Sequence, residues 1–158
     1  MIFFTVGTQF SFDRLLSSFD KWKRDSGSGL DAFGQIGDSH LKDLSFPNKN
    51  FINLDEYSKC FEKADIIVSH AGMGTVLKAL SASKPIIVMP RLFKYSEHRN
   101  DHQVATCKKI RNLNGCYVAE TEGELHEFLN NISSLEVSKL PEYAPEEFQK
   151  YIYDQIFN

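Results

Sequence analysis

Two segments of this sequence combine glycines with side chains that can bind an anion. Residues 69–75 read Ser-His-Ala-Gly-Met-Gly-Thr, and residues 7–9 read Gly-Thr-Gln. Glycine lets the backbone approach a ligand closely, while hydroxyl and imidazole groups add hydrogen bonds. Alone, Gly7-Thr8-Gln9 also fits a plain turn and His70 a buried structural histidine. Neither spacing matches a P-loop or a dinucleotide-binding fingerprint, so we expect a phosphate site outside those two classes.

A third segment offers groups suited to a sugar. Residues 97–103 read Glu-His-Arg-Asn-Asp-His-Gln and stand where we expect a helix to begin. Seven consecutive polar residues exceed what an exposed helix face needs, so some should point into a ligand crevice. The carboxylate, imidazole and amide of Asp101, His102 and Gln103 can bind sugar hydroxyls through paired hydrogen bonds. The alternative is a solvent-exposed start of the helix.

The same segment leaves a metal site open as an alternative. His98 and His102 are four residues apart, which on a helix places them on one face near Asp101, and this is workable spacing for zinc. The sequence is not H-E-x-x-H, however, and no cysteine stands at ligand spacing. A metal-dependent hydrolase is therefore a competing hypothesis, and we expect no metal.

The elements that must position these residues alternate between short apolar runs and longer amphipathic stretches. This pattern predicts an α/β fold with a doubly wound, Rossmann-like and mainly parallel sheet. The expected strands are 2–6, 32–36, 51–54, 66–69, 86–89 and 116–118. Apolar spacing predicts one helix through Phe12, Leu15, Leu16, Phe19 and Trp22 and another through Val76, Leu77, Leu80 and Ala82. A further helix is expected over 97–111. A capping box at Thr121 and Glu124 predicts the start of the next one.

The expected topology brings the two glycine segments together. If the first and fourth strands are neighbours, as in the order 3-2-1-4-5, both segments open into one crevice at the carboxyl edge of the sheet. We expect the helices that follow them to present two N-termini to this crevice. Each carries about half a positive charge, so together they could offset a diphosphate without a divalent metal.

Length and composition limit the other possibilities. The 158 residues suit one domain, which we expect to comprise a donor-binding unit over 1–132, followed by a connector and C-terminal helix over 133–158. That helix, with Phe148, Tyr151, Ile152 and Ile156, should pack on the domain or on a partner. Eighteen basic and twenty-one acidic residues give a net charge of −3 without a long basic run, which disfavours nucleic-acid binding.

Cysteine content and hydropathy predict a cytoplasmic protein. The three cysteines cannot all pair within the chain and form no C-x-x-C, so we expect reduced thiols. The first strand stands where a secretory leader would, and no run of 18 apolar residues occurs. Any membrane association should therefore come from a partner.

Together the three segments resemble the C-terminal, donor-binding domain of family 28 glycosyltransferases. The resemblance runs from Phe4 to at least Arg111 and includes residues 84–91, Lys-Pro-Ile-Ile-Val-Met-Pro-Arg. More narrowly, the chain is similar to bacterial exopolysaccharide and capsule PssE-type subunits, which are related to the soluble subunit of the eukaryotic two-chain UDP-GlcNAc transferase. The resemblance implies one half of a GT-B enzyme, with the other half on a separate, membrane-anchored subunit that binds a lipid-linked sugar acceptor.

The resemblance also implies roles for individual residues. Gly7, Thr8 and Gln9 would border the diphosphate, and Arg91 and Glu97 would contribute to donor binding. The phosphate oxygens of a UDP-sugar would be held by His70, Gly72, Gly74 and Thr75, and the donor sugar by Asp101, His102 and Gln103. Many relatives have a ribose-binding acidic residue three positions after the loop threonine, where this chain has Lys78.

The implied reaction is inverting transfer of a hexosyl unit, with galactose or glucuronic acid favoured, from a UDP-sugar to a polyprenyl-diphosphate-linked sugar. The catalytic base is not identified: His70 is conceivable, and a residue of the partner is favoured. The partner would recruit the chain to the cytoplasmic face of the membrane. A non-catalytic nucleotide-sugar-binding or assembly module is the alternative, to which Lys78 gives some weight.

Overall fold

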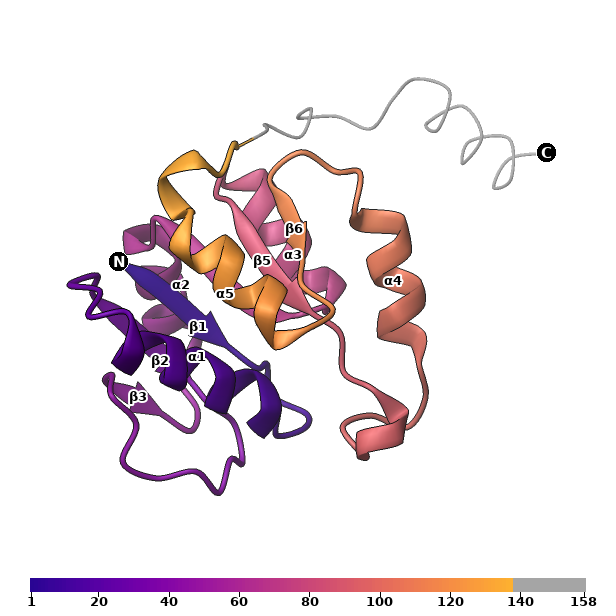
Figure 1. Cartoon of the computed structure of the whole chain (residues 1–158), viewed down its shortest axis with the longest axis horizontal. Helices are drawn as coiled ribbons and strands as arrows, with labels where there is room; N and C mark the ends of the chain where they lie inside the picture. Colours follow the sequence, from indigo (N-terminus) through magenta and orange to yellow (C-terminus); the bar gives the residue numbers. More distant parts are fainter. Residues whose placement is uncertain (138–158) are drawn as a thin grey trace.

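The computed structural model describes residues 1–137, which form a three-layer α/β domain (Figure 1). Six strands form one sheet in the order β3-β2-β1-β4-β5-β6, and every neighbouring pair is parallel. The strands are β1 (Ile2–Thr5), β2 (Ala32–Gln35), β3 (Asn48–Lys49), β4 (Ile66–His70), β5 (Ile86–Met89) and β6 (Cys116–Val118). The predicted doubly wound, parallel sheet is confirmed, and β1 lies beside β4, which was the condition for a shared crevice.

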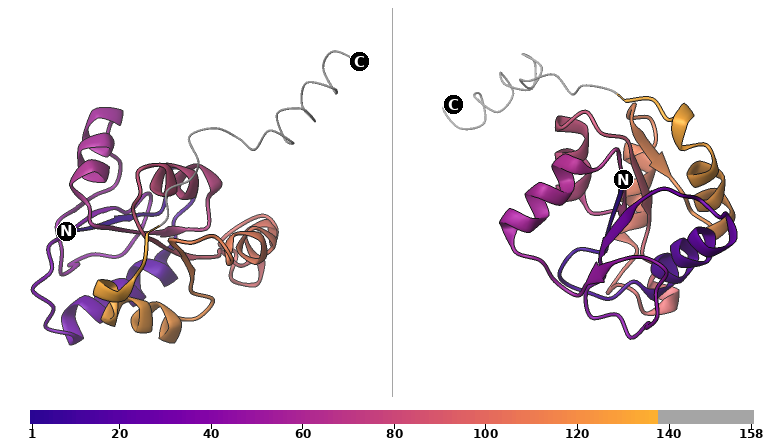
Figure 2. Two further views of the ribbon diagram at one scale, coloured as in Figure 1. Left: turned by 90° about the horizontal axis from the view of Figure 1, so that it is seen from above. Right: turned by 90° about the vertical axis from the view of Figure 1, so that its left-hand side faces the viewer.

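The helices lie on both faces of the sheet (Figure 2). They are α1 (Asp13–Asp25), α2 (Leu54–Lys63), α3 (Met73–Ser81), α4 (His102–Ile110) and α5 (Glu122–Asn130), with short 3₁₀ turns η1 (Phe93–Tyr95) and η2 (Ile132–Ser134). Alternation along β1 divides the core: Ile2 and Phe4 pack with α1 and α5, while Phe3 packs with α2 and α3. The sheet is therefore buried on both faces, as parallel sheets generally are.

The apolar spacing predicted the packing of α1 and only part of that of α3. Phe12, Leu15, Leu16, Phe19 and Trp22 are all buried, as expected. On α3, Val76 and Leu80 are buried, but Leu77 is 48% exposed and Ala82 lies beyond the last turn. Ala79 fills the core position in their place.

The predicted strand over 51–54 is wrong. The third strand is Asn48–Lys49, and α2 begins at Leu54. Asn53 caps this helix, since its Oδ1 accepts a hydrogen bond from the Glu56 amide at 2.9 Å. The apolar run was misleading because Leu54 is 85% exposed and does not belong to the core.

The predicted helix over 97–111 begins five residues later than expected, at His102. Residues 97–101 form a series of bends, in which the Glu97 and Asp101 carboxylates accept hydrogen bonds from the amides of Leu92 and Phe93. The helix predicted after Thr121 is confirmed as α5, with the Thr121 hydroxyl accepting from the Glu124 amide.

Three further expectations concern the chain as a whole. All three cysteines are free, as expected. No helix within residues 1–137 is long and apolar enough to cross a membrane. The expected helix with Phe148, Tyr151, Ile152 and Ile156 lies outside the described residues.

Candidate donor-binding site

A cavity of about 280 Å³ lies where β1, β4 and β5 end. Because β1 and β4 are adjacent and parallel, the segments that follow them open on the same edge of the sheet. The cavity collects both glycine segments and parts of the segment after β5. Its lining residues are Val6, Gly7, Thr8, Gln9, His70, Gly72, Gly74, Thr75, Arg91, His98 and Gln103.

His70 occupies the space between the two glycine segments. A Cβ atom on Gly72 would lie 2.3 Å from His70 Nε2, and one on Gly7 would lie 2.8 Å from His70 Cε1. Gly7 also has a φ of +76°, a conformation that favours glycine. These two glycines are therefore required by the position of the imidazole, whereas a Cβ on Gly74 would meet nothing within 4 Å.

The His70 imidazole is neutral at physiological pH. Burial, followed by the charges of Arg91 and His98, lowers the pKa of His70 to about 4. Its Nδ1 lies 3.3 Å from the Ser69 hydroxyl, which donates to the Thr5 carbonyl at 2.9 Å. A neutral imidazole held in this way can exchange hydrogen bonds with a ligand but is a poor proton acceptor.

Arg91 is a buried cation at the inner wall of this cavity. Only 2% of the residue is exposed, and its Nη2 donates to the carbonyl oxygens of Val6 (2.8 Å) and Phe10 (2.6 Å). These bonds join the segment after β5 to the segment after β1. Burial lowers the pKa of Arg91 to about 10, which still leaves it charged at neutral pH.

Gln103 lines the cavity, while the other residues expected to contact the sugar lie outside its lining. Gln103 is buried, and its Oε1 accepts a hydrogen bond from the Arg91 amide at 3.0 Å. Asp101 is exposed and bonds the Phe93 amide, and His102 is exposed at the start of α4. Of this group only Gln103 faces the cavity in this conformation.

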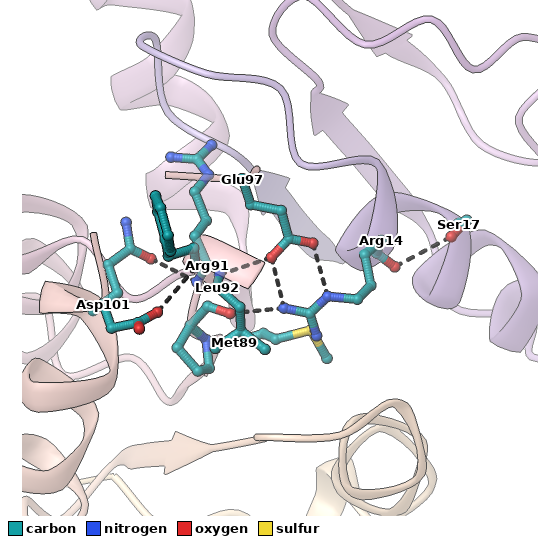
Figure 3. Close-up of polar contacts among 10 residues, drawn as sticks. Arg14, Ser17, Met89, Arg91, Leu92, Glu97 and Asp101 are labelled. Atoms are coloured by element: carbon teal, nitrogen blue, oxygen red, sulfur yellow. Dashed lines mark hydrogen bonds and ion pairs between the residues drawn. The ribbon is translucent and has the colours of Figure 1, made fainter. Parts of the chain in front are cut away.

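Glu97 holds the segment after β5 against α1 (Figure 3). Its two oxygens accept from Arg14 Nε (2.8 Å) and Nη2 (2.9 Å), and Oε2 also accepts from the Leu92 amide (2.9 Å). Arg14 Nη2 further donates to the Pro90 carbonyl at 2.8 Å. Glu97 thus contributes to the site by positioning this segment, and it does not line the cavity.

The N-termini of α1 and α3 contribute differently. Gly72, Gly74 and Thr75 bring the first turn of α3 to the cavity, and no side chain of the described residues caps this helix. An uncapped first turn leaves N–H groups free for an anion. The expectation that α1 does the same is wrong, because α1 begins at Asp13 and none of its residues lines the cavity.

The structure does not place His98 and His102 as the alternative zinc site required. His98 precedes α4 and His102 is the first residue of that helix, so the two are not one helical turn apart. Within residues 1–137, no group of three His, Cys, Asp or Glu side chains could hold a metal ion together.

A larger hollow of about 750 Å³ adjoins the cavity, and Gly7 and Thr8 line both. Its other residues were not among the site residues predicted from the sequence. Gln35, at the end of β2, donates from Nε2 to the Gly7 carbonyl at 3.1 Å and so supports the first glycine segment. The hollow is lined by Thr5, Gly7, Thr8, Gln35, Ile52, Asn53, Leu54, Asp55 and Tyr57. The Asn-Leu-Asp-Glu start of α2 was the signal that could have identified this wall.

The sequence of residues 1–153 matches the Glycosyltransferase family 28 C-terminal domain. The chain belongs to this family. It is 31% identical over 121 residues to the human UDP-N-acetylglucosamine transferase subunit ALG13, a match that covers 69% of this chain and 10% of that protein. It is also 33% identical over 72 residues to the UDP-N-acetylglucosamine--N-acetylmuramyl-(pentapeptide) pyrophosphoryl-undecaprenol N-acetylglucosamine transferase of Prochlorococcus marinus.

Solved structures agree on the fold of this family 28 domain. The crystal structure of MurG from Acinetobacter baumannii aligns with a TM-score of 0.62 at 17% identity, over 84% of this chain and 41% of that one. The Prochlorococcus match covers 43% of this chain and 19% of that protein. The chain thus spans a fifth or less of these two curated relatives, and its fold is the Rossmann-like half of a GT-B glycosyltransferase.

Lys78, the position where the resemblance led us to expect an acidic residue, packs on α2. Its Nζ lies 4.5 Å from the ring centre of Tyr57 and 4.9 Å from that of Phe61. A cation at this distance from an aromatic face is attracted to the ring. Because Tyr57 lines the larger hollow, Lys78 places a positive charge beside it.

Proposed function

We propose that this chain is the donor-binding subunit of a two-chain inverting glycosyltransferase that uses a UDP-sugar. The observation that carries this proposal is the convergence of both glycine segments on one cavity between β1 and β4. Ligands of open α/β sheets bind at this switch point, and an uncapped helix N-terminus suits a phosphate. Family membership supports the same function.

The two adjoining hollows suggest how the donor lies. The diphosphate would occupy the smaller cavity beside His70, Gly72, Gly74 and Thr75. The uridine would extend over Gly7 and Thr8 into the larger hollow, whose volume of about 750 Å³ suits a nucleoside. The sugar would then lie toward Gln103, with Asp101 and His102 approaching when the donor is bound.

The acceptor and the second subunit are inferred from the relatives. The human relative is named as a transferase subunit, and the Prochlorococcus relative as acting on a pyrophosphoryl-undecaprenol substrate. A membrane-anchored partner would bind a polyprenyl-diphosphate-linked sugar and recruit this chain to the cytoplasmic face of the membrane. Exopolysaccharide or capsule synthesis is the setting proposed, with galactose or glucuronic acid as the favoured sugar.

The chemistry requires a base and stabilisation of the leaving group. An acceptor hydroxyl attacks the anomeric carbon, the bond from that carbon to the β-phosphate breaks, and UDP departs with the electron pair. The uncapped turn of α3 would stabilise the charge that develops on the phosphate. Since the pKa of His70 is about 4, we assign the base to the partner subunit.

The direct test is transfer from radiolabelled UDP-sugars to a short polyprenyl-diphosphate sugar, with and without the co-expressed partner. We expect turnover only with both chains and unchanged turnover in excess EDTA, because no metal is required. Loss of activity in EDTA that zinc restores would contradict the metal-free reaction.

The alternative, a non-catalytic nucleotide-sugar-binding module, rests on the observation of Lys78 beside the larger hollow. It predicts that the partner alone transfers sugar and that Gly74→Asp in this chain leaves turnover unchanged. The glycosyltransferase proposal predicts that this variant abolishes turnover, since a carboxylate at Gly74 would repel the diphosphate. Turnover of the Gly74→Ala control should persist.

A further inference from the structure

We propose that Arg91 supplies the fixed positive charge that binds the donor diphosphate, and that His98 provides a second N–H donor beside it. The proposal rests on the proposed function and assigns its electrostatics to side chains. The resemblance gave Arg91 only as a general contributor to donor binding and assigned His98 no role in it.

Arg91 has no counter-charge. Within residues 1–137, no carboxylate oxygen lies within 4.0 Å of its guanidinium, and its Nε is buried without a hydrogen-bond partner. Glu97, whose charge acts on Arg91 from farther away, is bonded to Arg14 and the Leu92 amide. A buried, unpaired cation is strongly unfavourable unless an anion joins it. The adjacent cavity is where an anion can bind.

The helices do not supply enough charge without Arg91. First-turn residues of α3 and of α4 line the cavity, and each helix terminus is equivalent to about half a positive charge, so the two together supply about one. A diphosphate carries more than one negative charge. The difference requires a cation, and Arg91 is the only Lys or Arg residue of the described chain that lines this cavity.

His98 completes this side of the cavity. Its Nδ1 is buried and has no partner among the described residues. Its ring packs edge-on against Phe10 with centroids 5.5 Å apart, and the Arg91 guanidinium lies 5.9 Å from the same ring. Phe10 therefore packs against both side chains next to the first glycine segment. A modest rotation of the His98 imidazole would present its N–H to a phosphate oxygen.

Arg99 offers a matched control. Its guanidinium also lies over Phe10, at 6.0 Å, but the residue is exposed and does not line the cavity. A substitution here removes a positive charge from the same segment and leaves the proposed site intact.

The experiment is titration calorimetry of the full chain with UDP, uridine and inorganic pyrophosphate. Removing a hydrogen-bonded charge should weaken UDP and pyrophosphate binding about 10- to 100-fold in Arg91→Met, with smaller losses in Arg91→Lys and His98→Gln. Uridine affinity should change less than about twofold in each variant, and Arg99→Gln should bind all three ligands as the wild type does.

The outcomes separate this proposal from the one on which it rests. Wild-type protein that binds neither UDP nor pyrophosphate would overturn the proposed function. Wild-type binding that is retained in full by folded Arg91→Met and His98→Gln would overturn the present inference alone. Equal loss of uridine and UDP affinity would also overturn it, because Arg91 would then act only by bonding the Val6 and Phe10 carbonyls. If Arg91→Met does not fold, Arg91→Lys and His98→Gln decide the question.

Discussion

At the scale of single residues, the site depends on one imidazole held between two glycines. The contact of His70 with Gly7 and Gly72 explains why neither position accepts a larger residue. It also leaves His70 only partly exposed, and this desolvation is the main cause of its lowered pKa. The glycines of the site therefore do different things: two make room for a side chain, and Gly74 faces open space where a ligand can bind.

Substitution by alanine should distinguish these glycines. We expect Gly72→Ala to lower the free energy of unfolding by about 1–3 kcal/mol, because its Cβ would overlap the His70 ring. Gly74→Ala should leave stability unchanged or raise it by up to about 1 kcal/mol, since Gly74 is helical and unobstructed. Urea unfolding measures both. Equal stability of the two variants would contradict the packing of His70.

Burial of neutral His70 should make the protein sensitive to mild acid. The unfolded chain takes up a proton on this residue near pH 6.5, whereas the folded chain does so only near pH 4. The contribution of His70 is therefore fully present above pH 6.5 and is lost as pH falls toward 4, to a total of about 3 kcal/mol. Unfolding free energies of the wild type and His70→Gln, measured between pH 7.5 and 4.5, should show a smaller acid loss in the variant. Parallel stability curves for the two proteins would contradict the burial of a neutral His70.

Residue types indicated most of the site, but contacts between distant residues were not accessible to sequence reasoning. The hydroxyl and glycine content of residues 7–9 and 69–75 led us to expect an anion site, and both segments line one cavity. Nothing local indicates that Gln35 bonds the Gly7 carbonyl or that Arg91 reaches Val6, because those bonds join different strands. His98 was considered only as a metal ligand, since its spacing from His102 suggested a shared helix face.

At the scale of elements, the segment between β5 and α4 is fixed by ion pairing and not by helix formation. The Arg14 and Glu97 side chains are only 18% and 10% exposed, and together they bond Pro90 and Leu92 as well as each other. This pair connects α1 to the segment that carries Arg91 and His98. The cavity wall after β5 therefore depends on a contact outside the cavity.

Removing the Glu97 carboxylate should loosen this segment. Glu97→Ala leaves Arg14 and the Leu92 amide without their partner, and we expect a loss of about 3 kcal/mol in stability. Faster hydrogen exchange at the Leu92 amide should accompany it. Glu56→Ala, which breaks the exposed pair with Lys49, serves as the control and should have a much smaller effect. Unchanged exchange at Leu92 in Glu97→Ala would contradict the positioning role.

The predicted boundaries of helices and strands were wrong where polar side chains form hydrogen bonds with the backbone. Asn53 lies within an apolar run but caps the start of α2. The carboxylates of Glu97 and Asp101 accept hydrogen bonds from nearby amides, and α4 begins only after them. Apolar periodicity carries no information about such bonds. The helix expected from the apolar stripe through Leu15 and Trp22 is confirmed as α1, for which no boundaries were predicted.

At the scale of the whole molecule, strand order is what creates the site. Placing β1 beside β4 brings together segments more than 60 residues apart and leaves the 7–9 and 70–75 segments on one edge. In the sequence analysis this order was a condition for a shared crevice, and it agrees with the rule that ligands of open α/β sheets bind where successive connections go to opposite faces. The proposed function places the donor on this fold, the Rossmann-like half of a GT-B glycosyltransferase, and assigns acceptor binding to a partner subunit.

The most direct test of the central claim is an NMR titration of ¹⁵N-labelled protein with UDP. If both glycine segments bind one diphosphate, the amides of Thr8 and Gly74 should shift together, with one dissociation constant. Amides at the opposite edge of the sheet, such as Ser28 and Gly115, should not move. Shifts confined to one segment, or separate constants for the two, would contradict the account.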